Sequence, residues 1–447
     1  HRHRTWHRRL RTYREVTLTI TLALTLTKFK VQSSTIQQLI NSTTIKSLIS
    51  IRYLLIILFT LLTDACSAQP VASEQQGLPL HVGAEVLMEE AMPEGRIAIV
   101  ANQTSLVGTT HLVDTLLAKG VNIVKIFCPE HGFRGTAAAG ATVANSTDPR
   151  TGLPIVSLYG KNKKPTPEQM SDIDIVIFDL QDVGCRFYTY ISTLHYVMEA
   201  CAERGIPCIV LDRPNPNGHY VDGPVLDTKY SSFVGMHPVP IVYGLTIGEY
   251  ATMINGEHWL KGGLRCDLTV ITMQGYRRDS VYPLPVPPSP NLRNTHAIAL
   301  YPSLCLFEGT NVSVGRGTNT PFEIIGIPST YSTLWCVNTL FTLANGQKAE
   351  ATYFTPQGGG QHYGIDLTQI HVPAKLDLSY LIAMYNLTKE GFFFLKNNFF
   401  EKLAGNATLR KQLQQGLSEK EIRASWEPDL SQYKELRKKY LLYPDVN

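Results

Sequence analysis

Four clusters of polar residues each follow a short apolar run in the first half of the chain. The clusters are residues 102–105, 129–134, 179–190 and 212–218. Apolar runs of this length are typical of buried parallel strands, and the carboxyl ends of parallel strands meet at one edge of a sheet. We therefore expect the clusters to lie close together. Their carboxylates, amides, arginines and aromatic rings are suited to sugar binding and proton transfer.

Glu130 is the strongest catalytic candidate. Pro129 would hold a turn directly after an apolar strand, so that one carboxyl group faces the cleft, as a glycosidic acid requires. The structural alternative is an ion pair with Arg134 in the same loop. Glu308, in an apolar and glycine-rich turn, is a second acidic candidate from the other domain. Its structural alternative is to hold the glycine-rich loop.

A further set of residues is suited to substrate binding. In one short segment, the Arg186 guanidinium could bind a substrate carboxylate, and the rings of Tyr188 and Tyr190 could stack on a sugar. A solvated pair between Asp182 and Arg186 is the alternative. The other candidates are polar residues of the strand-end loops and of the glycine-rich stretch: Asn102, His131, Arg134, Asp212, Asn215, Asn311, Arg316 and Asn319. For the three residues of the glycine-rich stretch, Asn311, Arg316 and Asn319, the structural alternative is that they cap turns.

The elements that position these residues alternate along residues 78–290. Five near-continuous apolar runs predict buried strands at residues 96–101, 122–127, 155–158, 173–178 and 208–211. Residues 111–119 and 193–204 carry apolar residues at helical spacing, and each stretch is followed by a glycine, the usual helix stop. This alternation predicts an α/β fold with a parallel sheet.

A proline-rich segment at residues 283–290 predicts the connection to a second domain. Residues 291–447 contain a polar, glycine-rich stretch, strand-like segments and a helical C-terminus, and we expect them to form a smaller α+β domain. Ser418 followed by Glu421 predicts a capping box at the start of the last helix.

Residues 1–70 are predicted to be an upstream extension and a secretory signal. Arg52 precedes a short apolar core at residues 53–62, and small residues follow it. The core is too short for a membrane-spanning helix, and a buried helix of the folded domain is the alternative. We therefore expect an exported protein. Cleavage after Ala68 would release it into the periplasm, whereas acylation of Cys66 would anchor it to lipid.

Composition and missing motifs exclude several function classes. The formal net charge is +4, and much of the excess comes from the first fifteen residues, so no nucleic-acid partner is expected. No GxGxxG follows the first apolar run, and Ser313 lacks the first glycine of a GxSxG elbow. His131 has no HExxH or spaced ligand set, and the cysteines show no CxxC spacing. Neither a metal site nor a disulfide framework is predicted.

Together the motifs resemble one family, the exo-acting β-N-acetylmuramidases called NamZ. The resemblance extends from about Val82 to Tyr443. It rests on the number and order of its segments, which are residues 102–105, 129–135, 179–184, 186–190, 212–218, 308–311 and 440–443. The resemblance implies a Rossmann-like N-terminal domain, a smaller C-terminal domain, an active site in the cleft between them and no cofactor.

The resemblance also implies an activity. The enzyme would release N-acetylmuramic acid (MurNAc) from the non-reducing end of peptidoglycan fragments for recycling, with endo-acting wall hydrolases supplying the chain ends. Glu130 stands at the position of the family's proposed catalytic glutamate. With Glu308 as the second carboxyl group, a separation of about 5 Å would indicate a retaining enzyme and about 6.5–9.5 Å an inverting one. The acetamido group of the substrate could instead act as the nucleophile.

Two other functions fit parts of the pattern. A non-catalytic peptidoglycan-binding protein would use the aromatic residues and arginine without needing Glu130. A cell-wall amidase or deacetylase is the other alternative, but such enzymes usually depend on zinc, and the sequence lacks an obvious ligand set.

Overall fold

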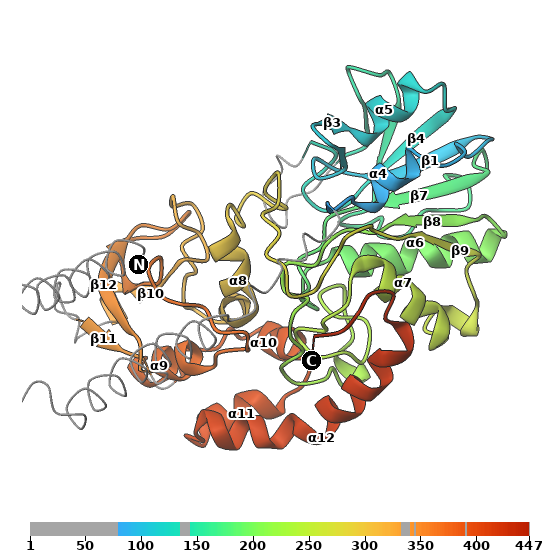
Figure 1. The fold of residues 1–447 in the computed structure, drawn as a ribbon. Helices are drawn as coiled ribbons and strands as arrows, with labels where there is room; N and C mark the ends of the chain where they lie inside the picture. The colour runs from blue at the N-terminus through green and yellow to red at the C-terminus, as the bar shows by residue number, and fades with distance from the viewer. Residues whose placement is uncertain (1–78, 135–143, 332–339, 344–345, 389–390, 447) are drawn as a thin grey trace, which may run out of the picture. The chain divides into compact units, whose positions relative to one another are not determined.

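The N-terminal part of the chain is built around a seven-stranded sheet in the computed structural model (Figure 1). Its strands are β1 (Ile97–Ala101), β4 (Ile123–Cys128), β5 (Ser146–Thr147), β6 (Pro154–Ser157), β7 (Ile175–Asp179), β8 (Cys208–Leu211) and β9 (Leu268–Ile271). They lie in the order β5-β6-β4-β1-β7-β8-β9, and all neighbours are parallel except β5 and β6. Without the edge strand β5, this is the 3-2-1-4-5-6 order of the Rossmann sheet. The predicted Rossmann-like α/β class is confirmed.

Helices pack on both faces of this sheet. They are α4 (Gly83–Leu87), α5 (Leu112–Ala118), α6 (Tyr190–Arg204) and α7 (Ile247–Gly256). Every residue of β1 is buried. Ile97 and Ile99 share a core with residues of α4 and α5, whereas Ala98 and Val100 share one with residues of α6 and α7. The five predicted strands correspond to β1, β4, β6, β7 and β8. Burial on both faces of the sheet explains why their sequences are apolar almost throughout.

The C-terminal part combines a smaller sheet with helices. Its sheet is antiparallel, in the order β10-β13-β12-β11. The strands are β10 (Ile324–Pro328), β11 (Leu340–Thr342), β12 (Lys348–Phe354) and β13 (His362–Asp366). The α-helices are α8 (Thr295–Leu304), α9 (Ser379–Leu387), α10 (Phe399–Ala404), α11 (Thr408–Gln414) and α12 (Glu419–Arg437). This mixture agrees with the smaller α+β region expected from the sequence.

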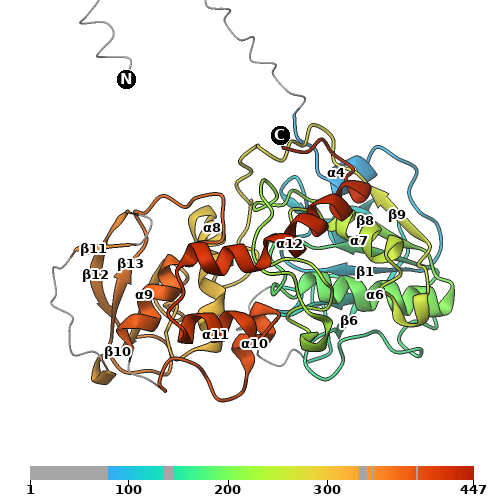
Figure 2. The same ribbon diagram turned by 90° about the horizontal axis from the view of Figure 1, so that it is seen from below.

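The last helix returns to the N-terminal part (Figure 2). It begins with the predicted capping box, because Ser418 Oγ accepts from the Glu421 amide and the Glu421 carboxylate accepts from the Ser418 amide at 2.9 Å. Further along, the Tyr433 hydroxyl donates to the Tyr243 carbonyl at 2.8 Å. Residues Leu78–Asn447 form one compact unit.

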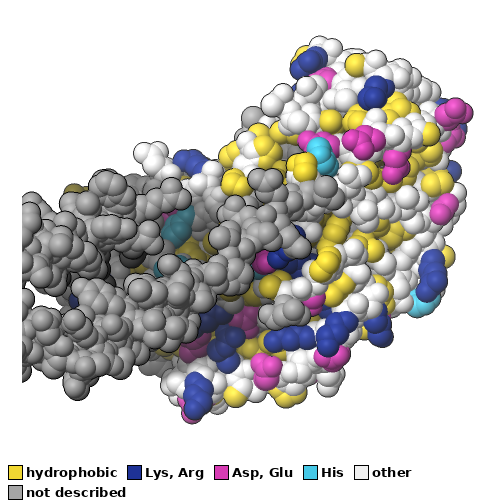
Figure 3. Space-filling model, viewed as in Figure 1, with side chains coloured by type: hydrophobic (Ala, Val, Ile, Leu, Met, Phe, Trp, Pro, Cys, Tyr) yellow, Lys and Arg dark blue, Asp and Glu magenta, His cyan; other side chains and the backbone are white. Residues whose placement is uncertain are grey.

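Short elements complete the part of the chain that is described, which comprises residues 79–134, 144–331, 340–343, 346–388 and 391–446. They are β2 (Leu106–Val107), β3 (Thr110–His111), and the 3-10 helices η1 (Thr228–Tyr230), η2 (Lys261–Gly263), η3 (Cys305–Gly309), η4 (Ser329–Tyr331) and η5 (Lys438–Tyr440). The predicted extension and signal segment, residues 1–70, lie outside these ranges. Within them, no helix is long and apolar enough to cross a membrane. Acidic and basic side chains are intermingled on the face shown in Figure 3.

Candidate active site

A pocket of about 860 Å³ lies where the loops of the parallel sheet meet the C-terminal part. The loops after β4, β6 and β7 form one side, and α8, η3, α10 and the loops next to β10 and β12 form the other. Its size is in the range of small-ligand sites. Many of its lining side chains are aromatic, as sugar binding by stacking requires: Tyr159, Phe187, Tyr188, Tyr190, Phe233, Tyr301, Phe307, Phe322 and Phe399.

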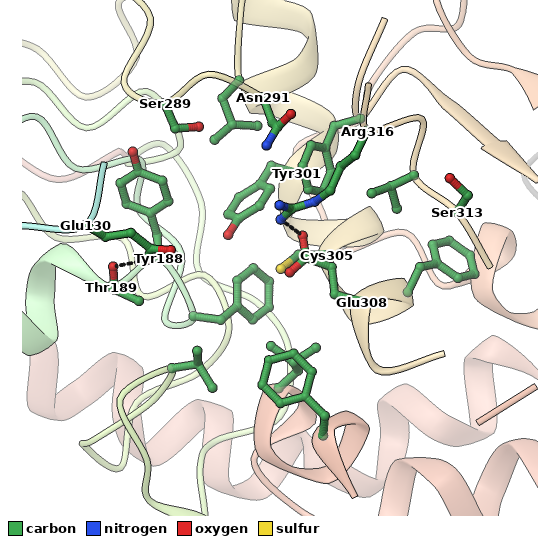
Figure 4. A pocket seen from close by; sticks show the side chains of 18 of the residues that line it. Glu130, Tyr188, Thr189, Ser289, Asn291, Tyr301, Cys305, Glu308, Ser313 and Arg316 are labelled. Atoms are coloured by element: carbon green, nitrogen blue, oxygen red, sulfur yellow. Dashed lines mark hydrogen bonds and ion pairs between the residues drawn. The ribbon is translucent and has the colours of Figure 1, made fainter. Parts of the chain in front are cut away.

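Seven of the predicted site residues line this pocket, and they come from both parts of the chain. They are Glu130, His131, Tyr188, Tyr190, Glu308, Asn311 and Arg316. Figure 4 shows Glu130 and Glu308 facing the pocket from opposite sides. The sequence-based expectation that both carboxyl groups reach one cleft therefore agrees with their positions.

Glu130 is held in a tight turn after β4. The Gly132 amide donates to the Pro129 carbonyl at 3.1 Å, which closes the turn around the carboxyl-bearing residue. The Thr189 hydroxyl donates to Glu130 Oε2 at 3.0 Å (Figure 4). The Tyr159 hydroxyl also bonds to this carboxylate, and burial together with the Glu130 charge raises the pKa of Tyr159. Two hydroxyl groups thus orient the Glu130 carboxylate at the pocket wall.

Two residues that line the pocket hold a strained backbone conformation. His131, next to Glu130, has a φ of 72°, and Phe322 has a φ of 61°. Positive φ is uncommon for residues other than glycine and is an outlier for a bulky aromatic residue. Such strain persists only where the surrounding structure enforces it, and it concentrates at functional sites. The two positions flank the pocket from the N-terminal and the C-terminal part.

Glu308 forms an ion pair with Arg316 across the glycine-rich loop after η3 (Figure 4). Burial alone would lower the pKa of Arg316, but the charge of Glu308 and the hydrogen bond to it raise this pKa. The Arg316 guanidinium also lies 5.6 Å from the centre of the Phe322 ring. Glu308 is therefore held by a guanidinium group, whereas hydroxyl groups hold Glu130.

Tyr188 and Tyr190 lie side by side in the wall, with ring centres 4.7 Å apart. Their hydroxyls donate to the Pro288 carbonyl at 2.9 and 3.3 Å. Asn102 Nδ2 donates to the Tyr190 hydroxyl at 2.7 Å, yet Asn102 does not line the pocket. The proline-rich segment therefore has a role in the site, because its carbonyl fixes both rings, and Asn102 acts through Tyr190.

The remaining predicted binding residues lie outside the pocket and bond to other protein groups. Arg134 pairs with Asp148 at 2.7 Å. Asn215 Nδ2 donates to the Leu245 carbonyl at 2.7 Å. Arg186 is fully buried, and its guanidinium donates to three backbone carbonyls. Their positions give no support to substrate binding; each instead holds a loop of the fold.

Asp212 is likewise a structural carboxylate. It is fully buried at the end of β8 and accepts hydrogen bonds from Thr246 Oγ1 at 2.7 Å and from the Gly248 amide at 2.8 Å, both at the start of α7. The Tyr443 hydroxyl donates to it at 2.6 Å. Burial raises the pKa of Asp212 to about 6. This residue ties the end of the chain to the parallel sheet.

Asp182 lies buried behind the pocket wall, where it accepts from the Tyr243 hydroxyl and from the Gly184 amide at 2.7 Å. Burial raises its pKa from 3.8 to about 7. In the window between these values the folded state holds a proton that the unfolded state has lost, so stability decreases as pH rises through it.

Asp182→Asn should remove this dependence, because the amide does not titrate. Between about pH 5 and about pH 8, the free energy of unfolding of the wild type relative to the variant should fall by about 2–3 kcal/mol. Urea unfolding at the two pH values measures this difference. A constant difference would show that Asp182 titrates alike in the folded and the unfolded state.

Several pocket residues were not predicted. Tyr159 and Lys163 follow β6, the third predicted strand, and the rule that polar residues after a strand face the site would have found them. Tyr301 lies on α8, and no local sequence signal marks it. The loop after β12 adds Gln357, and the first residue of β13 adds His362, whose Nδ1 lies 2.9 Å from the Gly360 carbonyl oxygen. No group of three or more His, Cys, Asp or Glu side chains in the described residues could hold a metal ion.

The chain is similar to proteins of one family along most of its length. Residues 97–296 match the family "Exo-beta-N-acetylmuramidase NamZ, N-terminal", and residues 299–443 match "Exo-beta-N-acetylmuramidase NamZ, C-terminal". The peptidoglycan β-N-acetylmuramidase NamZ of Bacillus subtilis is 40% identical over 404 residues, which are 85% of this chain and 95% of the relative.

Two crystal structures of DUF1343 family proteins from Bacteroides fragilis have the same fold. One is 44% identical with a TM-score of 0.71, and the other is 30% identical with a TM-score of 0.69. In each comparison the match covers 82% of this chain and 99% of the solved one.

Proposed function

Because the chain belongs to the NamZ family of exo-β-N-acetylmuramidases, we propose that its pocket binds the terminal MurNAc residue of a peptidoglycan fragment. The protein is a glycosidase that releases this residue from the non-reducing end. The observation that carries the assignment of the pocket is the placement of Glu130. Two hydroxyls orient its carboxylate in an aromatic-lined pocket, and a second carboxylate faces it.

Glu130 is the group that protonates the glycosidic oxygen in this proposal. Bond cleavage needs a proton on the leaving oxygen, and a carboxyl group at the pocket wall can supply it. The hydroxyls of Thr189 and Tyr159 restrict the rotation of the carboxyl group, which favours one orientation toward the leaving oxygen.

Glu308 is the second carboxyl group. Its ion pair with Arg316 holds the carboxyl group in the pocket wall opposite Glu130, where it could attack the anomeric carbon or activate water. The distance between the two carboxyl groups at the bound sugar decides between retention and inversion. If the acetamido group of the substrate attacks instead, Glu308 and Arg316 would orient that group.

Export and peptidoglycan recycling belong to the same proposal. The apolar core at residues 53–62 supports a secretory signal, with either release into the periplasm or a lipid anchor at Cys66. An enzyme that removes only terminal residues needs chain ends, so endo-acting wall hydrolases are its natural functional partners.

The test uses protein that starts near Ser73, incubated with a chromogenic β-N-acetylmuramide and, in parallel, with the matching β-N-acetylglucosaminide. Release from the muramide alone is the expected result. If neither substrate is cleaved while a MurNAc-containing disaccharide still binds, the protein is a peptidoglycan-binding module and the catalytic assignment is wrong. A chelator should not change the rate, whereas a zinc-dependent amidase or deacetylase would lose activity.

A further inference from the structure

The substrate brings a negative charge into a pocket that already contains two carboxyl groups. MurNAc differs from N-acetylglucosamine by a lactyl ether, which ends in a carboxylate. Like charges at close range repel each other unless a cation lies between them or next to one of them. Three Lys and Arg side chains line the pocket: Lys163, Arg316 and Lys402. Arg316 is already paired with Glu308, which leaves the two lysines.

Lys163 lies on a loop that is fixed on both sides of it. Asn162 Nδ2 donates to the Ser157 carbonyl at 2.9 Å. Lys164 Nζ pairs with Glu199 and with Glu203, each at 2.7 Å. Because both neighbours are held by contacts outside the pocket, the backbone of Lys163 has little freedom. The side chain of Lys163 therefore extends from a fixed backbone position.

The Lys163 ammonium group is also placed within the pocket. It lies 4.7 Å from the centre of the Phe233 ring, a cation–π contact with a residue that itself lines the pocket. Among the described residues, no carboxylate forms an ion pair with it. A half-buried ammonium group over an aromatic ring and without an acidic partner is suited to bind an anionic group of a ligand.

The position of Lys163 relative to Glu130 follows from two aromatic rings. The Phe233 and Tyr159 ring centres are 6.0 Å apart, and the Tyr159 hydroxyl bonds to Glu130. Lys163 thus belongs to the Glu130 side of the pocket. Lys402, by contrast, is exposed on α10, at the other side.

We propose that Lys163 binds the lactyl carboxylate of MurNAc and so selects muramic acid residues over glucosamine residues. This role rests on the proposed function, because it names the specificity determinant of the same pocket. Arg186, which the sequence suggested for this carboxylate, is buried against backbone carbonyls and does not line the pocket.

The test compares a chromogenic muramide with the same compound whose lactyl carboxylate is replaced by a carboxamide. The wild type should prefer the carboxylate by about 10- to 100-fold in kcat/KM, as expected for a hydrogen bond to a charged group. Lys163→Met retains the packing of the side-chain stem on Phe233 and should abolish this preference, mainly through KM. Lys163→Arg should retain it. Lys161→Met, an exposed lysine of the same loop outside the pocket, is the matched control and should behave as the wild type.

A Lys163→Met variant that keeps the carboxylate preference would overturn the proposal, as would loss of the preference in Lys402→Met alone. Calorimetric binding of free MurNAc and of its lactyl carboxamide to the same variants separates this proposal from the proposed function. If the wild type binds with the preference, Lys163→Met binds without it and no variant cleaves a muramide, then the hydrolytic function fails and the assignment of Lys163 holds.

Discussion

Glu130→Gln should lower kcat/KM for a natural MurNAc-containing disaccharide by about 100- to 10,000-fold, the usual contribution of a positioned general acid. An amide has the size of the carboxyl group and can still bond to the hydroxyls of Thr189 and Tyr159, so the turn after β4 should stay folded. It cannot, however, give a proton to the leaving oxygen. Initial rates and thermal unfolding of the same preparations measure the two properties separately.

The leaving group provides the control for the role of Glu130. A muramide with a strongly acidic phenol as leaving group needs no protonation, so Glu130→Gln should lose much less activity on it than on a natural disaccharide. Equal losses on both substrates would show that Glu130 is the nucleophile or a binding residue, not the acid. Unchanged activity on the natural disaccharide would place the chemistry elsewhere in the pocket.

The fold could be predicted because most strands of the large sheet are buried on both faces. Such strands are apolar throughout, and five of them were recognised from that property alone. The two missed strands lack it: the two residues of β5 are exposed at the edge, and in β9 only the last residue, Ile271, is buried. An edge strand forms because it pairs with a neighbouring strand, and a short stretch of sequence does not show which strand that is.

The site could be predicted in part, because polar residues after a strand serve two purposes that look alike in sequence. Glu130 and Tyr188 face the pocket, whereas Asp182 and Asp212 satisfy buried backbone and hydroxyl groups. Residue type and spacing do not show in which direction a loop side chain points. The third strand end, which carries Tyr159, was missed although the same rule covers it.

Arg186 is the clearest example of a predicted binding residue that bonds to the protein's own backbone instead. Its substitution is the second change for which we expect a large effect, in this case on stability. Its Nη1 donates to the carbonyls of Pro224 at 2.8 Å and Val239 at 2.7 Å, and its Nη2 donates to the carbonyl of Leu403 at 2.9 Å. Burial lowers its pKa to about 9, so the guanidinium is still charged near neutral pH. The residue joins the loop after β7 to α10, which forms part of the pocket wall.

Arg186→Met should therefore reduce the free energy of unfolding by about 3–5 kcal/mol, because it leaves buried carbonyl groups without donors. Methionine fills much of the volume of the arginine stem, so the loss comes mainly from the hydrogen bonds. Arg186→Lys keeps the charge but has no planar fork to reach three carbonyls, and its loss should be smaller. Urea unfolding of the three proteins gives the order.

A substrate-binding arginine would behave differently. Arg186→Met would then raise KM for the muramide and leave the unfolding midpoint unchanged, whereas a structural arginine lowers the midpoint first. Gly405, at the end of α10, supports the structural role, because a Cβ there would lie 2.7 Å from Nη2 of Arg186. Gly405→Ala should consequently destabilise the wild type more than it destabilises the Arg186→Met variant. The methionine side chain lacks the Nη2 atom that the new Cβ would clash with in the wild type. Equal effects in both backgrounds would mean that the cause is independent of Arg186, namely the positive φ of Gly405, 77°, or the close approach of the new Cβ to Leu226 Cα at 3.0 Å.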